Sequence, residues 1–146
     1  MTQAQTSLDS RPAPTSSFDA IIVGAGFAGL YLVYLLRQRG FKVRAYEAGG
    51  DVGGTWYWNR YPGCRVDIVS LEYSYEFSEE LQQEWQWSEK YATQPELLRY
   101  ARYVAERFDL RKDIQFNTRI TAAHFNDTNG RWLVETDQGE QISAQF

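Results

Sequence analysis

The feature that most constrains the fold is the run Gly24-Ala25-Gly26-Phe27-Ala28-Gly29, which follows apolar residues 21–23 and begins a segment with helical periodicity. Between a strand and a helix, the first glycine permits a tight turn, the second lets a pyrophosphate approach the backbone, and the third lets helix and strand pack closely. The N-terminus of the helix adds unpaired N–H groups and the positive end of its dipole. The same glycines could form a turn that binds nothing, but their position between strand and helix favours a dinucleotide site.

Glu47 ends the next apolar segment, eighteen residues after Gly29. An acidic residue at this point of a βαβ unit accepts hydrogen bonds from the hydroxyls of a ribose. Because its charge disfavours a 2′-phosphate, the sequence favours FAD or NAD over NADP at this site.

The alternation of apolar and helical segments predicts an α/β fold with a parallel sheet and a right-handed crossover. Thr93 and Glu96 have the spacing of a capping box, so a second long helix is expected to begin there. Asn129-Gly130 and residues 137–139 are typical hairpin turns. The expected elements are parallel strands at 18–23, 42–46 and 114–116, helices at 27–39 and from 94 to near 108, a long irregular segment at 48–94, and an antiparallel meander at 120–125, 132–136 and 141–146.

The composition fits one packed domain and limits its partners. With 146 residues, 43% of them hydrophobic, the chain can form one core. A net charge of −4 without a basic block argues against nucleic acid and against a membrane as partners. The single cysteine, Cys64, excludes an internal disulfide and favours a reducing compartment, so we expect a cytoplasmic protein without a metal site. Residues 1–17 are expected to form a flexible arm before a domain at 18–146.

A family resemblance rests on the run Gly53-Gly54-Thr55-Trp56-Tyr57-Trp58-Asn59-Arg60-Tyr61-Pro62-Gly63, with Glu47 upstream and Arg65-Val66-Asp67 downstream. This pattern resembles the N-terminal FAD-binding part of the type I Baeyer–Villiger monooxygenases, near the phenylacetone and steroid monooxygenase branch. The similarity extends over nearly all of residues 19–146. It implies a Rossmann-like FAD-binding domain of the two-dinucleotide-binding-domain flavoproteins, with an antiparallel β-meander and truncated before the domain is complete.

The candidate site combines the glycine motif with the resemblance. A second glycine pair, Gly53-Gly54, leaves room for backbone beside a flavin, and residues 55–58 offer N–H groups and an aromatic wall. By resemblance, Ile68 and Tyr73 lie against FAD and the backbone of Ile120 meets the adenine end. The expected cofactor-binding residues are Gly24, Gly26, Phe27, Gly29, Glu47, Gly54, Thr55, Trp56, Tyr57, Trp58, Arg65, Val66, Asp67, Ile68, Tyr73 and Ile120.

The resemblance assigns a catalytic role to one residue of this chain. Asp67 matches the carboxylate that holds the family's catalytic arginine in place, and a carboxylate paired with such a cation stays ionised and orients it. A cap on a helix or a turn is the alternative role for Asp67. Arg65 matches a position near the nicotinamide cofactor, and a surface arginine is the alternative there.

The activity that the resemblance implies uses FAD, NADPH and O₂ to convert a ketone to an ester or lactone through a C4a-peroxyflavin. The family's catalytic arginine, its NADPH-binding glycine motif and its fingerprint sequence all lie after the position of Phe146 in related chains. We therefore expect an N-terminal portion without the NADPH domain, inactive by itself. An N- or S-oxygenating flavin monooxygenase and a non-catalytic flavin-binding module are the alternatives.

Overall fold

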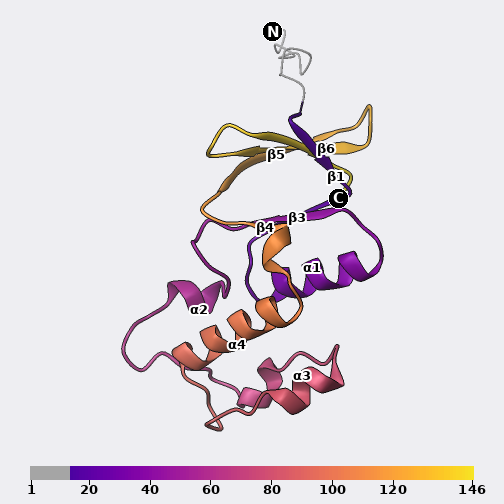
Figure 1. The fold of residues 1–146 in the computed structure, drawn as a ribbon. Coiled ribbons are helices and arrows are strands. Elements are labelled where there is room, and N and C mark those ends of the chain that lie inside the picture. Colours follow the sequence, from indigo (N-terminus) through magenta and orange to yellow (C-terminus); the bar gives the residue numbers. More distant parts are fainter. Residues whose placement is uncertain (1–13) are drawn as a thin grey trace.

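Two sheets divide the strands in the computed structural model, which describes residues 14–146 (Figure 1). The first is a parallel three-stranded sheet with the order β2-β3-β4, formed by β2 (Ala20–Val23), β3 (Val43–Tyr46) and β4 (Ile114–Gln115). Ala20 pairs with Val43 and Val23 with Tyr46. This arrangement confirms the predicted parallel α/β unit and its third strand.

The second sheet has four strands in the order β1-β7-β6-β5. Its strands β5 (Ile120–Asn126), β6 (Arg131–Thr136) and β7 (Gln141–Ala144) are antiparallel, and β1 (Ser16–Phe18) pairs parallel to β7. The predicted meander is confirmed, although β7 ends two residues earlier than expected. Ser16 and Ser17, which we expected in the flexible arm, are hydrogen-bonded into this sheet, and residues 1–13 lie outside the described residues.

The strand predicted at 18–23 is wrong as a single element, because the chain passes from one sheet to the other at Asp19. The Asp19 carboxylate accepts a hydrogen bond from the Lys42 amide at 2.7 Å, beside the start of β3. The Asp19 carbonyl accepts hydrogen bonds from the amides of Gln145 and Phe146, just after β7. Asp19 is therefore held by both sheets, and the strand divides there into β1 and β2.

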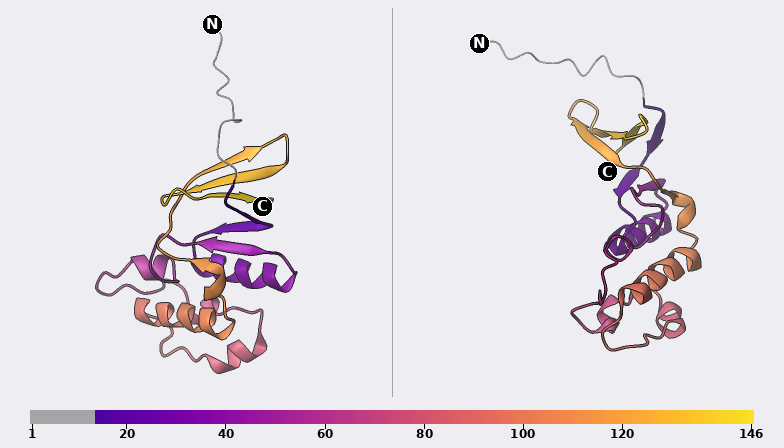
Figure 2. Two further views of the ribbon diagram at one scale, coloured as in Figure 1. Left: turned by 45° about the horizontal axis from the view of Figure 1, so that its top comes forward. Right: turned by 90° about the vertical axis from the view of Figure 1, so that its left-hand side faces the viewer.

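The main helices lie on the side of the parallel sheet that faces away from the four-stranded sheet (Figures 1 and 2). Helix α1 (Phe27–Gln38) packs on the sheet, and α4 (Gln94–Arg107) packs below α1. The buried face of α4 includes Leu97, Ala101 and Val104, each fully enclosed. Burial of a Leu or Val side chain stabilises a fold by about 1.5–3 kcal/mol, so this face fixes α4 against the core.

The predicted capping box at α4 is wrong. Thr93 makes no side-chain cap hydrogen bond, and its backbone instead forms a β-bridge with Arg65. The buried carboxylate of Glu96 accepts hydrogen bonds from the amide and hydroxyl of Ser88, at 2.9 and 2.8 Å. Glu96 is thus satisfied by the preceding loop and does not turn back to the helix end.

The segment expected to be irregular contains three short helices, α2 (Thr55–Trp58), η2 (Ser70–Tyr73) and α3 (Glu79–Glu84). A further short helix, η3 (Arg111–Asp113), precedes β4. Asp51 anchors the start of the segment, because its two carboxylate oxygens accept hydrogen bonds from Arg102 on α4 and Arg111 on η3, each at 2.7 Å. The loop that carries the second glycine pair is therefore tied to the helical layer.

Candidate functional site

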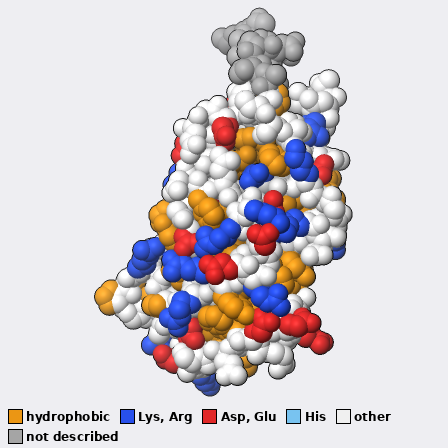
Figure 3. Space-filling view, in the orientation of Figure 1, with side chains coloured by type: hydrophobic (Ala, Val, Ile, Leu, Met, Phe, Trp, Pro, Cys, Tyr) orange, Lys and Arg blue, Asp and Glu red, His pale blue; other side chains and the backbone are white. Residues whose placement is uncertain are grey.

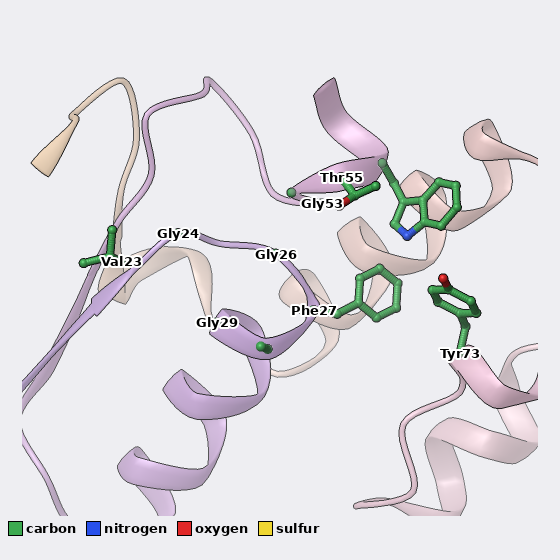
Figure 4. Close-up of a pocket in the computed structure, with 11 residues that line it drawn as sticks. Val23, Gly24, Gly26, Phe27, Gly29, Gly53, Thr55 and Tyr73 are labelled. Carbon is green, nitrogen blue, oxygen red and sulfur yellow. The ribbon is translucent and has the colours of Figure 1, made fainter. Parts of the chain in front are cut away.

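Two adjoining cavities, of about 420 and 400 Å³, lie where β2 and β3 end and α1 begins. They share Val23, Gly24, Gly26, Gly54 and Thr55, so they form one groove. Figure 4 shows the first cavity, with the glycine turn and the 53–55 loop on facing sides. We call the first cavity the aromatic end, lined further by Phe27, Ala28, Gly29, Gly53, Trp56 and Tyr73, and the second the acidic end, lined further by Tyr46, Glu47, Ala48, Trp58, Thr118, Arg119 and Ile120.

Two glycine contacts shape the floor of the groove. A Cβ atom at Gly54 would lie 2.9 Å from the Cα atom of Gly26, and Gly54 has a φ of +54°. A Cβ atom at Gly29 would lie 2.0 Å from the Gly24 carbonyl oxygen, which is possible only if α1 moves away from β2. The close approach of Gly29 to Gly24 is the helix–strand packing that the motif predicts for the third glycine. The contact of Gly54 with Gly26 brings the two glycine segments together backbone to backbone.

The N-terminus of α1 opens into this groove without a side-chain cap. Gly26 is the N-cap residue, and the first turn contains no acidic side chain. The first helical hydrogen bond is donated by the Leu30 amide to the Gly26 carbonyl at 2.9 Å, so the amides of Phe27, Ala28 and Gly29 have no partner within the helix. Such a terminus, with its positive dipole end, is an anion site.

Glu47 is 4% exposed and joins the two loops. One carboxylate oxygen accepts a hydrogen bond from the Ala25 amide and the other from the Gly49 amide, both at 2.7 Å. Each oxygen of a carboxylate can accept a second hydrogen bond. Glu47 therefore holds the glycine turn against the following loop and keeps acceptor capacity at the acidic end of the groove.

Aromatic rings form the wall of the aromatic end. Tyr73 makes edge contacts with Phe27 and Trp56, at ring-centroid distances of 5.7 and 5.6 Å (Figure 4). Burial raises the pKa of Tyr73, and the nearby charge of Asp67 raises it further, so the phenol stays neutral and can donate a hydrogen bond. Trp56 is held by its carbonyl oxygen, which accepts a hydrogen bond from the Gln94 side chain.

The structure brings most of the predicted site residues to the groove. Those lining it are Gly24, Gly26, Phe27, Gly29, Glu47, Gly54, Thr55, Trp56, Trp58, Tyr73 and Ile120.

Five other predicted residues do not line the groove. The Tyr57 hydroxyl accepts a hydrogen bond from the Gly50 amide at 3.2 Å, Arg65 pairs with Glu89 at 3.2 Å, and Val66 is buried in the core. Ile68 and Asp67 are exposed. Within residues 14–146, no hydrogen bond or ion pair involves the Asp67 side chain. Cofactor contact by these residues stays a prediction.

Thr118 and Arg119 at the acidic end are residues that sequence reasoning missed. The Thr118 amide donates to the Glu47 carbonyl at 2.9 Å, which places residues 118–120 beside the end of β3. A usable signal was present, since ligands in open α/β sheets bind at the carboxyl ends of the strands and both residues follow the predicted third strand.

Two further findings concern only the part of the chain that the structure describes. It contains no group of three or more His, Cys, Asp or Glu side chains placed to hold a metal ion. None of its helices is both long and apolar enough to cross a lipid bilayer.

Comparison with known proteins supports the same reading of the fold. A family model described as an NAD(P)-binding Rossmann-like domain matches residues 22–83. The steroid monooxygenase structure bound to NADP superposes with a TM-score of 0.87 at 58% identity, covering 89% of this chain and 25% of that chain. A structure titled OTEMO in complex with FAD and NADP gives a TM-score of 0.84 at 47% identity, covering 92% of this chain and 25% of that chain.

Curated relatives give the same picture. The 2-oxo-Δ3-4,5,5-trimethylcyclopentenylacetyl-CoA monooxygenase of Pseudomonas putida is 47% identical over 94% of this chain and 25% of its own length. A Baeyer–Villiger monooxygenase of Pseudooceanicola batsensis is 47% identical over 90% of this chain and 24% of its own length. A phenazine N-monooxygenase of Lysobacter antibioticus is 45% identical over 88% of this chain and 24% of its own length.

This chain thus spans about a quarter of the length of the curated relatives it matches. Over that quarter, the predicted resemblance to the Baeyer–Villiger monooxygenases and the predicted Rossmann-like fold are confirmed.

Proposed function

We propose that this chain is the N-terminal FAD-binding part of an NADPH- and O₂-dependent monooxygenase that converts ketones to esters or lactones. The observation that carries the proposal is the open N-terminus of α1, with three unpartnered amides directed at a groove whose floor is two touching glycine segments. The sequence and structural similarity to flavin monooxygenases supports the choice of FAD over other dinucleotides.

The residues of the groove fit the parts of FAD in order. Glu47, Trp58 and the 118–120 segment would hold the adenosine, with the remaining acceptor capacity of Glu47 taking the ribose hydroxyls. The amides of the first turn of α1 would hold the pyrophosphate. Phe27, Trp56 and Tyr73 would lie against the flavin, which, when bound, supplies hydride acceptance and oxygen activation.

Two observations support a role for Asp67 in holding a cationic partner. Its side chain is exposed, and its charge raises the pKa of Tyr73, a residue of the aromatic end. In the proposed enzyme it would hold the guanidinium of the family's catalytic arginine, an interaction that fixes orientation through paired hydrogen bonds. This role makes Asp67 a positioning residue.

An N-oxygenating monooxygenase is the second candidate function, because a phenazine N-monooxygenase is nearly as similar to this chain as a Baeyer–Villiger enzyme is. Product analysis separates the two. The enzyme that carries this chain would insert oxygen beside a ketone carbonyl in one case and form an N-oxide from an aromatic amine in the other.

The single unpaired and buried cysteine supports the further proposal of a cytoplasmic location.

The test of FAD binding uses a charge placed at the α1 terminus. Ala28 is exposed and lines the groove, and aspartate in the first turn of a helix stabilises it by about 0.3–1 kcal/mol. We expect Ala28→Asp to keep or raise the melting temperature and to abolish binding of FAD, because the new carboxylate repels the pyrophosphate. Isothermal titration of the purified chain with FAD measures the affinity.

Gln38→Glu is the matched control, since it adds the same charge at the far end of α1. The two positions are about 15 Å apart along the helix, beyond the screening length of about 8 Å at physiological ionic strength. Equal affinities of Ala28→Asp and Gln38→Glu for FAD would contradict the proposed site.

A further inference from the structure

A continuous array of aromatic side chains leads from the groove to the opposite surface of the helical layer. From the groove outward, the array consists of Trp56, Tyr73, Phe27, Tyr75, Tyr100, Trp87, Trp85 and Tyr103. Neighbouring ring centroids in this order are 5.0–5.9 Å apart. These separations lie within the usual range of aromatic contact, so no aliphatic gap interrupts the array.

The groove end and the surface end are both defined. Trp56, Tyr73 and Phe27 line the aromatic end of the groove. At the other end, Tyr103 on α4 is half-buried and contacts Trp85 at 5.5 Å. Glu84, at the end of α3, is 36% exposed beside it. Acidic side chains gather at the lower right of Figure 3.

The acceptors of the Trp N–H and Tyr O–H groups differ between the middle of the array and its surface end. Oxidation of Trp or Tyr makes the N–H or O–H group strongly acidic, so a radical settles where a base takes the proton. Trp85 Nε1 is buried without a partner, and Trp87 Nε1 donates to the Ser74 hydroxyl, a poor base. The Tyr75 hydroxyl donates to the Phe27 carbonyl, which is also a poor base.

Tyr103 differs, because its hydroxyl donates to the carboxylate of Glu84. Within the described part of the array it is the one phenol with a hydrogen bond to a carboxylate. Glu84 also accepts two hydrogen bonds from Arg107, at 3.0 and 3.2 Å. The hydrogen bonds from Arg107 and Tyr103 lower the pKa of Glu84, so an ionised acceptor is present at neutral pH.

We propose that this array carries one-electron oxidising equivalents away from the groove and delivers them to Tyr103 at the surface. An oxidant in the groove removes one electron from Tyr73 or Trp56. Tyr75 then reduces this ring by electron transfer across the Phe27 ring, which lies between them and is not itself oxidised. Each further oxidised Tyr or Trp ring is reduced by the next Tyr or Trp outward. In the last step Tyr103 gives one electron to the Trp85 radical cation and its phenolic proton to Glu84. The products are neutral Trp85, a neutral Tyr103 radical and protonated Glu84, and a thiol or ascorbate in solution returns the electron and the proton.

The identity of the oxidant in the cell rests on the proposed function. An enzyme that reduces O₂ in the groove forms oxygen-derived radicals there when the reaction fails. The array itself does not depend on that function. Its test therefore uses an oxidant that is not a flavin, so failure of FAD binding and failure of the relay are separate results.

The experiment attaches a ruthenium(II) tris-bipyridine to Thr55→Cys in the full chain, with Cys64→Ala to leave a single thiol. Thr55 is exposed and lines both ends of the groove. Laser excitation with hexaammineruthenium(III) as electron acceptor generates the ruthenium(III) oxidant, and paramagnetic resonance of the frozen sample identifies the radical. We expect a neutral tyrosyl radical.

Three variants decide the outcome. Tyr103→Phe should lose the tyrosyl signal and leave a tryptophanyl radical, and Glu84→Gln should lower the tyrosyl yield because the proton acceptor is gone. Tyr91→Phe, which removes an exposed hydroxyl outside the array, should change nothing. Circular dichroism checks that each variant is folded. An undiminished tyrosyl signal in folded Tyr103→Phe, or an equal loss in Tyr91→Phe, overturns the proposal.

Discussion

Gly54 is the residue at which backbone conformation and the groove depend on each other. Its positive φ and its contact with Gly26 leave no room for a side chain. The sequence predicted a glycine pair beside a cofactor, but it did not predict that this pair would touch the first glycine motif. That contact depends on the three-dimensional course of the 48–54 loop.

The substitution Gly54→Ala is expected to destabilise the chain by more than backbone strain alone. A residue held at an unfavourable φ costs about 1–3 kcal/mol, and here the new Cβ atom also meets the Gly26 backbone at 2.9 Å. Gly63→Ala is the control, because Gly63 has a φ of +79° and open space around it. Urea unfolding of both variants measures the difference, and equal destabilisation would show that the contact with Gly26 contributes nothing.

Glu47 shows a second limit of sequence reasoning at this scale. Its place at the acidic end of the groove was predicted, whereas its two hydrogen bonds to backbone amides were not, because they join residues on two separate loops. A glutamine would supply one acceptor oxygen and leave one buried amide without a partner.

We therefore expect Glu47→Gln to lower the stability of the cofactor-free chain by about 1–3 kcal/mol, the cost of an unsatisfied buried group. Thermal unfolding without any nucleotide measures this effect. Glu79→Gln, on the exposed side of α3, is the control and should leave the melting temperature unchanged. A fully stable Glu47→Gln variant would restrict Glu47 to ligand binding.

At the scale of elements, the predicted strands and long helices were correct where periodicity was strong, as in α1 and α4. The errors lie where a side chain finds a distant partner. Glu96 was expected to cap α4, and its carboxylate instead accepts a hydrogen bond from Ser88. One strand was expected to run through Asp19, but Asp19 forms hydrogen bonds with both sheets and the strand is interrupted there. Local pattern alone cannot show such partners.

Asp51 links three elements, and its ionisation should control their stability. Partial burial opposes ionisation of Asp51, but hydrogen bonds from Arg111 and Arg102 outweigh burial and lower its pKa. Because the pKa of Asp51 is lower in the folded chain, its ionised carboxylate stabilises the fold at pH values above the unfolded-state pKa of about 3.9. This stabilisation is lost as the pH falls through the folded-state pKa.

The variant Asp51→Asn should therefore be less stable than the parent at pH 7 and should approach it in stability below about pH 4. Removing one partner of a partly buried ion pair leaves Arg102 and Arg111 without their acceptor, so we expect a loss of about 1–3 kcal/mol at neutral pH. Urea unfolding at several pH values gives the comparison. A stability difference that does not change with pH would refute the role of the Asp51 charge.

At the scale of the whole molecule, the division into two sheets was not predictable from the sequence. The meander and the parallel unit were both expected, but β1 joins the meander through residues assigned to a flexible arm. Pairing of β1 with β7 depends on contacts across more than a hundred residues, as in the hydrogen bond from the Thr15 amide to the Gln141 carbonyl. Short-range composition carries no signal of such a contact.

Arg131 on β6 is the side chain that holds this long-range pairing together. Its guanidinium donates to the Ser143 hydroxyl on β7 at 2.7 Å, and to the Ser17 hydroxyl and Phe18 carbonyl on β1 at 2.9 and 3.0 Å. Within the described residues, β1 is three residues long and pairs with β7 alone. Its other bonds include the one from the Lys42 ammonium group to the Ser17 carbonyl, at 2.7 Å.

We therefore expect Arg131→Ala to expose β1 selectively. Hydrogen exchange followed by mass spectrometry should show faster exchange in peptides covering 14–18 and 141–144, while peptides of α1 and β3 keep the protection of the parent chain. Arg99→Ala, an exposed position on α4, is the control and should alter neither region. Equally faster exchange in α1 and β3 would mean that the two sheets unfold as one unit and that Arg131 stabilises the whole fold. Faster exchange in β1 and β7 alone would mean that the four-stranded sheet opens independently of the groove.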